Sequence, residues 1–244
     1  MSNAFEILRH VTTATITTML LKKGIRHCWI KGAMPLVPGG QRLVGKAFTL
    51  RFVPVREDLA TPESWGKPIS TRAAIEAMPE GCIAVADAMG VTTAGIFGDI
   101  LVMRMARRKV TALVTDGVIR DKAGCLKANM PIFCQGTAAP ASVNGLTFVG
   151  WSEPIACGGV AIFPDDVIVV DDDGARGEPG LGGFERDRGG EGEHRQDGNG
   201  SVSTGGGVCY RPVESSDPVA GGFAHQPQRP GRADGLRAGD GGQG

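Results

Sequence analysis

The sequence predicts an α/β fold built on a mixed sheet, and three observations support this class. The 244 residues are 41% hydrophobic, which is enough to fill the core of an ordinary domain. Short β-prone segments bounded by Gly, Pro or Asn recur along residues 1–173, and helical segments lie among them. Because strand-like segments outnumber helical ones, we expect a mixed sheet rather than a strict alternation of strand and helix.

The first part of the chain contains two predicted helices and two predicted strands. Residues 5–23 carry apolar side chains at three- and four-residue spacings, which predicts a helix disturbed in the Thr-rich stretch 12–18. Residues 43–53 (LVGKAFTLRFV) combine β-branched and aromatic side chains, which is typical of a strand. Thr71 is placed to cap a short helix through Met78, and residues 82–88 (CIAVADA) predict a buried strand.

The next part of the chain begins with a predicted helix over residues 95–108, whose basic end suits a helix C-terminus. Four β-prone segments follow, over residues 110–119, 131–134, 146–151 and 160–170. One βαβ unit is expected from strand 82–88, helix 95–108 and strand 112–118.

The composition changes near Asp173, where we predict the end of the α/β domain. More than half of the 38 glycines fall in residues 174–244, which contain no Ile, Met or Lys. A segment of this composition offers little apolar area to offset the entropy lost on ordering, so we expect a Gly/Arg-rich, disordered tail. A second hypothesis is that a shifted reading frame in a GC-rich gene produced this C-terminus. The DNA sequence around codon 174 distinguishes the two.

The charge balance and cysteine usage favour a cytoplasmic protein. Lys and Arg number 26, as do Asp and Glu, so no net field recruits nucleic acid or a membrane surface. The basic run 104–109 is interpreted as the solvated end of a helix. The six cysteines form no CxxC pair, which suggests reduced thiols, and Cys125 is interpreted as a buried core thiol. The first residues lack the apolar run of a signal peptide, and no apolar stretch is long enough to span a bilayer.

Two polar motifs flank the predicted βαβ unit. Residues 98–101 (GDIL) lie near the start of its helix, and residues 116–121 (DGVIRD) follow its second strand. Ligands of open α/β sheets collect beyond the carboxyl ends of the strands, so we expect the two motifs to lie close together at that edge. Helix-start N–H groups at Ile100 and Leu101 can bind a carboxylate there.

The side chains of these motifs offer a matching set of groups. Arg120 carries a planar fork of donors that fits a carboxylate or a 2-oxo acid. Asp121 supplies hard oxygens for Mg²⁺ or Mn²⁺, and Asp99 can hold a metal-bound water or relay a proton.

Purely structural explanations of the same residues remain open. Arg120 and Asp121 can form an ion pair in a surface turn, where such pairs contribute little. Asp99 can complement a helix N-terminus, and Gly98 and Gly117 can serve turn geometry. The four histidines are scattered and no nucleophile elbow is present, so hydrolase chemistry has little support.

Taken together, the sequence resembles the RraA-like family, which contains the 4-hydroxy-4-methyl-2-oxoglutarate aldolases and the regulator of ribonuclease E activity. The resemblance depends on Asp99 followed after 20 residues by Arg120-Asp121, on the strand VTALVTDGVIRD and on the segment ACGGVAIFPDDVIVVDDDG. It extends over residues 12–174 and includes TATITTMLLKKG, GKAFTLRFVP and VADAMG.

This resemblance implies a swivelling α-β sandwich domain, assembled as trimers or hexamers, with a Mg²⁺ or Mn²⁺ site at the subunit interface. Arg120 would hold the carboxylate and 2-oxo group of a pyruvyl moiety, Asp121 would anchor the metal and Asp99 would lie beside them. Gly98 and the amides of Ile100 and Leu101 would complete the substrate site.

The implied activity is that of a metal-dependent class II aldolase, which cleaves a 4-hydroxy-2-oxo acid to pyruvate and decarboxylates oxaloacetate as a side reaction. The alternative is a non-catalytic regulator that binds and inhibits ribonuclease E. The chain departs from the aldolase pattern at Gly124, where the family carries Asp or Glu. A further acid comes in that family from the C-terminal region of a neighbouring subunit.

Overall fold

The computed structural model describes residues 2–178, which lie within one compact unit. Most of the predicted tail, from residue 179 onward, lies outside the described residues. Among the described residues no helix has the length and apolarity needed to cross a bilayer.

A nine-stranded mixed sheet organises the described residues, and the predicted α/β class is confirmed. Its strand order is β1-β9-β8-β3-β4-β5-β6-β2, with β7 paired to β3. The strands are β1 (Trp29–Ile30), β2 (Met34–Pro35), β3 (Leu43–Pro54), β4 (Ile83–Asp87), β5 (Ala112–Thr115), β6 (Ile132–Cys134), β7 (Leu146–Trp151), β8 (Val167–Asp171) and β9 (Gly174–Glu178).

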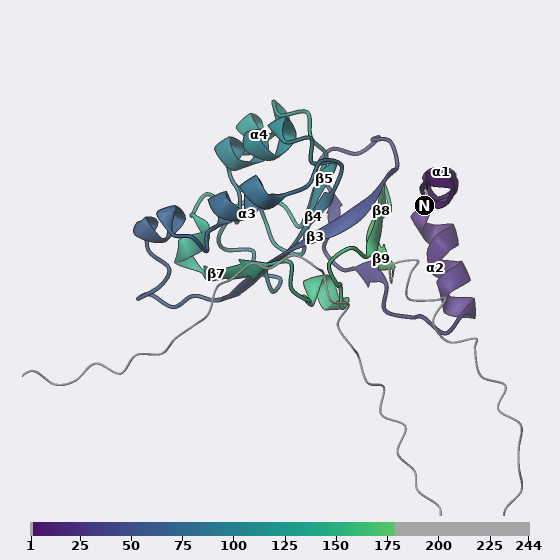
Figure 1. The fold of residues 1–244 in the computed structure, drawn as a ribbon, viewed down its shortest axis with the longest axis horizontal. Coiled ribbons are helices and arrows are strands. Elements are labelled where there is room, and N and C mark those ends of the chain that lie inside the picture. The colour runs from purple at the N-terminus through teal and green to yellow at the C-terminus, as the bar shows by residue number, and fades with distance from the viewer. Residues whose placement is uncertain (1, 179–244) are drawn as a thin grey trace, which may run out of the picture. The chain divides into compact units, whose positions relative to one another are not determined.

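Five α-helices and three short 3₁₀ turns accompany the sheet in the described part of the chain. They are α1 (Ser2–His10), α2 (Thr13–Lys22), α3 (Thr71–Ala77), α4 (Asp99–Arg107), α5 (Lys122–Leu126), η1 (Pro62–Gly66), η2 (Ser142–Asn144) and η3 (Cys157–Gly159). Helices α3 and α4 lie together on one side (Figure 1), whereas α2 contacts β8 and β9 and α1 contacts β3.

The two ends of the sheet approach each other, because only residues 31–33 separate β1 from β2 and β2 also contacts β9. Alternate residues of the strands therefore face an enclosed core, and the others face the helices. In β4, Ile83 and Val85 join the enclosed cluster, whereas Ala84 and Ala86 join the cluster that includes residues of α3 and α4. Strands β3, β4, β5 and β6 are parallel, and β4 and β5 are buried along their whole length.

The predicted βαβ unit is confirmed, since β4 and β5 are parallel neighbours joined through α4. Its helix begins at Asp99 rather than at Gly95. Gly95 forms bridges to Val118 and Ala141, and the N–H of Ile96 donates to the carbonyl of Val118 at 3.0 Å. These long-range pairings hold residues 95–96 in a strand-like conformation, which local helical spacing does not reveal.

Other boundaries also differ from the prediction, and the strand predicted over residues 110–119 is confined to β5. The N-terminal helix is two helices, because the Thr12 hydroxyl accepts a hydrogen bond from the N–H of Thr15 at 3.1 Å and caps α2. Ser70, not Thr71, caps α3, accepting from the N–H of Ala73 at 3.2 Å. The segment predicted as strand 160–170 is ordered as strand only in β8, because the carboxylate of Asp166 accepts from the Phe163 N–H in a preceding turn.

The predicted domain boundary after Asp173 falls inside a β-hairpin. Gly174 has a φ of 108° and starts β9, which pairs antiparallel with β8 along its whole length. Ala175 and Arg176 are fully buried. The α/β fold therefore extends at least to Glu178, and the Gly-rich composition begins within the sheet.

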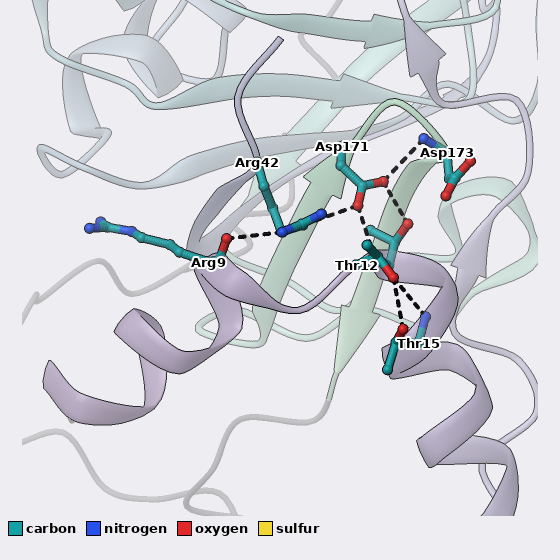
Figure 2. Close-up of polar contacts among 7 residues, drawn as sticks. Arg9, Thr12, Thr15, Arg42, Asp171 and Asp173 are labelled. Carbon is teal, nitrogen blue, oxygen red and sulfur yellow. Dashed lines mark hydrogen bonds and ion pairs between the residues drawn. The ribbon is translucent and has the colours of Figure 1, made fainter. Parts of the chain in front are cut away.

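A buried carboxylate attaches the N-terminal helices to the sheet (Figure 2). Asp171, at the end of β8, accepts hydrogen bonds from the N–H and the hydroxyl of Thr13, at 2.9 and 2.6 Å. It also accepts from Arg42 Nε at 3.1 Å, and a second nitrogen of Arg42 donates to the carbonyl of Arg9 at 3.0 Å. One side chain thus connects the end of α1 and the start of α2 to the sheet.

Candidate functional site

All six residues predicted as a functional site line one pocket of about 190 Å³. They are Gly98, Asp99, Ile100, Leu101, Arg120 and Asp121. This volume is below the range of roughly 300–1,000 Å³ that is common for drug-sized ligands, so the pocket suits a smaller molecule. The remaining lining residues are Trp65, Thr71, Arg72, Gly95, Ile96, Ala141 and Ser142.

Two helix starts meet at this pocket, since α4 begins at Asp99 and α5 begins after Asp121. The N–H of Arg120 donates to the carbonyl of Phe97 at 2.9 Å, which fixes the loop before α5 to the segment before α4. Asp121 has a left-handed backbone, with a φ of 54°, a conformation that Asp adopts more readily than most residues.

Two glycines allow the helix starts to approach closely. A Cβ atom on Gly98 would lie 2.7 Å from an oxygen of Asp121, and a Cβ atom on Gly124 would lie 2.5 Å from the Cβ atom of Asp99. Each carboxylate therefore packs against a glycine of the other helix start. At position 124, where the resemblance leads us to expect an acid, the side chain of Asp99 already occupies the space.

Arg120 and Asp121 form an ion pair with Nε and Oδ2 separated by 2.9 Å. Their side chains are 36% and 44% exposed, so solvent reaches the pair and its contribution to stability is small. Within residues 2–178, the Arg120 guanidinium donates one hydrogen bond, from Nε to Asp121. Its two terminal nitrogens donate none to these residues. These groups can therefore donate to a ligand.

The amides at the start of α4 are less available than predicted. The N–H of Ile100 donates to the Asp99 carboxylate at 2.7 Å. The amide of Leu101 is among the first-turn N–H groups that have no intrahelical partner. Leu101 thus keeps its predicted capacity to bind an anion, whereas Ile100 would first have to release Asp99.

Cys125 lies beside the pocket and is fully buried, as predicted. Its thiol donates to the carbonyl of Arg120 at 3.1 Å. Burial, together with the nearby charges of Asp99 and Asp121, raises the pKa of the Cys125 thiol to about 11. The neutral thiol supports the loop and is a poor nucleophile at neutral pH.

Asp116, directly after β5, binds the backbone of the loop after β4 and of η3. Its carboxylate accepts from the N–H groups of Ala88, Gly90 and Gly158 at 2.8 to 3.0 Å. Burial raises the pKa of Asp116, and these hydrogen bonds oppose that effect. Asp116 therefore holds these loops in place and does not line the pocket.

The basic run at the end of α4 is largely neutralised. Arg104 and Arg108 both pair with Glu76 of α3, at 2.6 and 3.3 Å, and Lys109 pairs with Glu80 at 2.7 Å. These ion pairs agree with the interpretation of a solvated helix end and leave little free charge for a nucleic acid.

The donor set of the pocket fits a hard divalent cation that retains water ligands. In the described part of the chain no group of three His, Cys, Asp or Glu side chains is arranged to hold a metal ion. Asp99 and Asp121 supply two carboxylates at the pocket, and Mg²⁺ is commonly bound through one or two carboxylates plus water and substrate oxygens.

Sequence reasoning missed the residues that complete the pocket from other elements. Trp65 comes from η1, Thr71 and Arg72 from α3, and Ser142 from η2. No motif marks them, because they reach the pocket through packing between segments that are distant in the sequence.

Comparisons with known proteins relate the chain to one family. A family model described as RraA-like, Aldolase/RraA, matches residues 13–175. A Halalkalibacterium halodurans protein provisionally named 4-hydroxy-4-methyl-2-oxoglutarate aldolase is 42% identical over 104 residues, which are 42% of this chain and 48% of that protein. Protein DlpA of Legionella pneumophila is 27% identical over 176 residues, which are 71% of this chain and 27% of DlpA. The chain thus spans about half, or less, of the length of these relatives.

Solved structures show the same fold. Streptomyces coelicolor RraAS2, described as an unusual member of the RNase ES inhibitor RraA protein family, is 35% identical with a TM-score of 0.64, over 72% of this chain and 83% of that one. An uncharacterised Pseudomonas syringae protein is 26% identical with a TM-score of 0.63, over 73% of this chain and 77% of that one.

Proposed function

The chain belongs to the RraA-like family, and on that premise we propose that it is a divalent-metal-dependent lyase that releases pyruvate from a 4-hydroxy-2-oxo acid. The observation that carries the proposal is the convergence of Arg120, Asp121 and Asp99 on one small pocket. The provisional aldolase name of the H. halodurans relative supports the same reaction class.

In this proposal Arg120 binds the carboxylate and the 2-oxo oxygen of the substrate through its terminal nitrogens, while Nε stays paired with Asp121. The Leu101 amide donates to the same carboxylate at the positive end of α4. Asp121 and Asp99 would hold Mg²⁺ or Mn²⁺, which when bound supplies Lewis-acid stabilisation of negative charge on the 2-oxo oxygen. Arg120 shares in that stabilisation, since its charge is fixed before the carbon–carbon bond breaks.

Metal removal tests the proposal directly. The full-length chain with Mg²⁺ is expected to release pyruvate from oxaloacetate, and EDTA is expected to lower the rate at least about tenfold, to the rate of an enzyme-free control. Mn²⁺ should restore activity. Absence of metal-dependent turnover in a folded preparation, with 4-hydroxy-4-methyl-2-oxoglutarate as well as oxaloacetate, would refute the lyase.

Gly98→Ala is expected to weaken metal binding without unfolding the protein. The added methyl group would displace the carboxylate of Asp121, which is the movable end of a half-exposed side chain. A disturbed ligand shell commonly costs about 10-fold or more in metal affinity. Titration of Mn²⁺ measures the change, with Gly40→Ala as control, because a Cβ atom on Gly40 meets nothing within 4 Å. If Gly98→Ala and Gly40→Ala bind Mn²⁺ with equal affinity, Asp121 is not a ligand of the metal.

The second candidate function is regulation of ribonuclease E. It is favoured by the 35% identity to a member of the RNase ES inhibitor RraA family. This function predicts binding to ribonuclease E at micromolar concentrations and persistence of that binding in Arg120→Ala. If the chain shows lyase activity but does not bind ribonuclease E, the regulatory function is excluded and the lyase remains.

We also propose that the chain forms a trimer or hexamer, as the family resemblance implies. Ile100 lines the pocket with 79% of its surface exposed, the largest exposure among the large apolar side chains of the described residues, so it is available for contact with a partner subunit. Light scattering on the purified chain measures the assembly, and Ile100→Asp is expected to weaken it.

A further inference from the structure

We infer that Arg72 determines substrate specificity by selecting 2-oxo acids that carry a second carboxylate. The inference rests on the proposed function, because it assigns a role within the same pocket. Arg120 would bind the pyruvyl end of the substrate, and Arg72 would bind the acidic group at the other end.

Arg72 is placed to share a ligand with Arg120. It lies in the first turn of α3, whereas Arg120 lies in the loop before α5, and both line the same pocket. Thr71 and Ser142 line the pocket as well and offer two hydroxyl groups. Thr71 is only 7% exposed, so this side of the pocket is formed by a well-packed element.

Arg72 also keeps its charge free for a ligand. Within residues 2–178, no carboxylate lies within ion-pair distance of Arg72, whereas Arg104 pairs with Glu76 and Arg56 pairs with Asp58. Instead, the Cζ atom of Arg72 lies over the ring of Trp65, 5.8 Å from its centroid. A cation–π contact orients a guanidinium without neutralising it, so its planar fork remains able to bind a carboxylate.

The charge balance of the pocket favours a dianionic substrate. The positive charges of Arg72 and Arg120 offset the negative charges of Asp99 and Asp121. A divalent cation held by the two carboxylates would therefore leave two positive charges in the pocket. A dicarboxylate neutralises both, whereas a monocarboxylate leaves one uncompensated, and this difference is the basis of selection.

Two unreactive ligands of equal chain length test the inference. Isothermal titration of the full-length chain with Mg²⁺ is expected to show 2-oxoglutarate binding at least about 10-fold more tightly than 2-oxopentanoate, as a charge-assisted hydrogen-bond pair requires. Arg72→Gln is expected to abolish this preference while leaving 2-oxopentanoate affinity unchanged. Arg72→Lys should retain part of it, because the charge remains and the fork is lost.

Arg107→Gln is the matched control, since Arg107 is an exposed arginine without a carboxylate partner in the described residues and does not line the pocket. It should leave both affinities unchanged. Arg120→Ala should weaken both ligands, because both share the pyruvyl end.

Equal affinity of the two ligands for the unmodified chain would overturn the role of Arg72 and leave the lyase proposal standing. If Arg72→Gln weakened the binding of 2-oxoglutarate and 2-oxopentanoate equally, the inference would also be overturned, because Arg72 would then bind the pyruvyl end that both ligands share. If neither ligand binds the folded, Mg²⁺-loaded chain, the proposed function itself fails, and the inference fails with it.

Discussion

Arg120→Ala is expected to lower kcat/KM for pyruvate release by about 100- to 1,000-fold. The guanidinium would contact both the carboxylate and the 2-oxo oxygen of the substrate, and removal of one preorganised donor to a developing oxyanion typically costs that much. The side chain is 36% exposed and its loss leaves no buried group unpaired, so the fold should be retained. Steady-state kinetics with oxaloacetate and Mg²⁺ measures the effect.

Two further variants identify what Arg120 contributes. Arg120→Lys keeps the charge but loses the planar fork, and we expect it to recover only a small part of the activity. Arg51→Ala is the control, because Arg51 also pairs with a half-exposed acid, Glu153 at 3.5 Å, but does not line the pocket. Unchanged catalytic efficiency in Arg120→Ala would remove the residue from the mechanism.

Much of the fold could be predicted because its core strands are continuous apolar segments. Strand β7 has the predicted bounds, and β4 and β6 lie within one or two residues of theirs. Errors arose where long-range pairing overrides local preference. Gly95 was predicted as helical but bridges to Val118, whose carbonyl also accepts from the Ile96 N–H. Gly174 has a tail-like composition but starts β9, which pairs with β8 and β1.

The site could be predicted only in part, for a similar reason. Asp99 lies on the connection that leaves the carboxyl end of β4, and Arg120 and Asp121 lie on the one that leaves β5, so the parallel topology brings them to the same edge of the sheet. Trp65 and Arg72 reach the pocket from the connection between β3 and β4, and the sequence does not reveal the path of that connection. The contact of Gly124 with Asp99 was equally hidden, and it changes the meaning of a departure from the family pattern. The acid expected at position 124 is absent because Asp99 occupies the space that its side chain would need.

Asp171→Asn is expected to lower the free energy of unfolding by about 3 kcal/mol, which is typical when one partner of a buried ion pair is removed. The side chains of Asp171 and Arg42 are only 10% and 19% exposed. Arg176, which is fully buried in β9, also interacts electrostatically with Asp171, and burial lowers its pKa to about 10. Loss of the carboxylate charge would remove a negative charge that stabilises the positive charges of Arg42 and Arg176. Chemical denaturation at pH 7 measures the change.

The pH dependence of that difference tests whether the charge is responsible. Burial acts to raise the pKa of Asp171, but the hydrogen bonds from Thr13 and Arg42 outweigh it, and the pKa is lowered overall. A lowered folded-state pKa gives stability that is fully present above the unfolded value of about 3.9 and is lost as the pH falls through the folded value. The difference between the two proteins should therefore stay constant from about pH 7 to pH 5 and shrink below about pH 4.

Asp165→Asn provides the matched control, because Asp165 pairs with Lys46 at 3.2 Å with both side chains largely exposed, and Asn tolerates its left-handed backbone. It should cost less than about 1 kcal/mol at every pH. If Asp171→Asn were equally mild, the N-terminal helices would be held mainly by the apolar contacts of Ile16 and Leu20 with β8. At low pH the wild-type carboxylate is protonated and uncharged. If Asp171→Asn still lowered the free energy of unfolding by the same amount there, the hydrogen-bond geometry of Asp171, and not its charge, would be responsible.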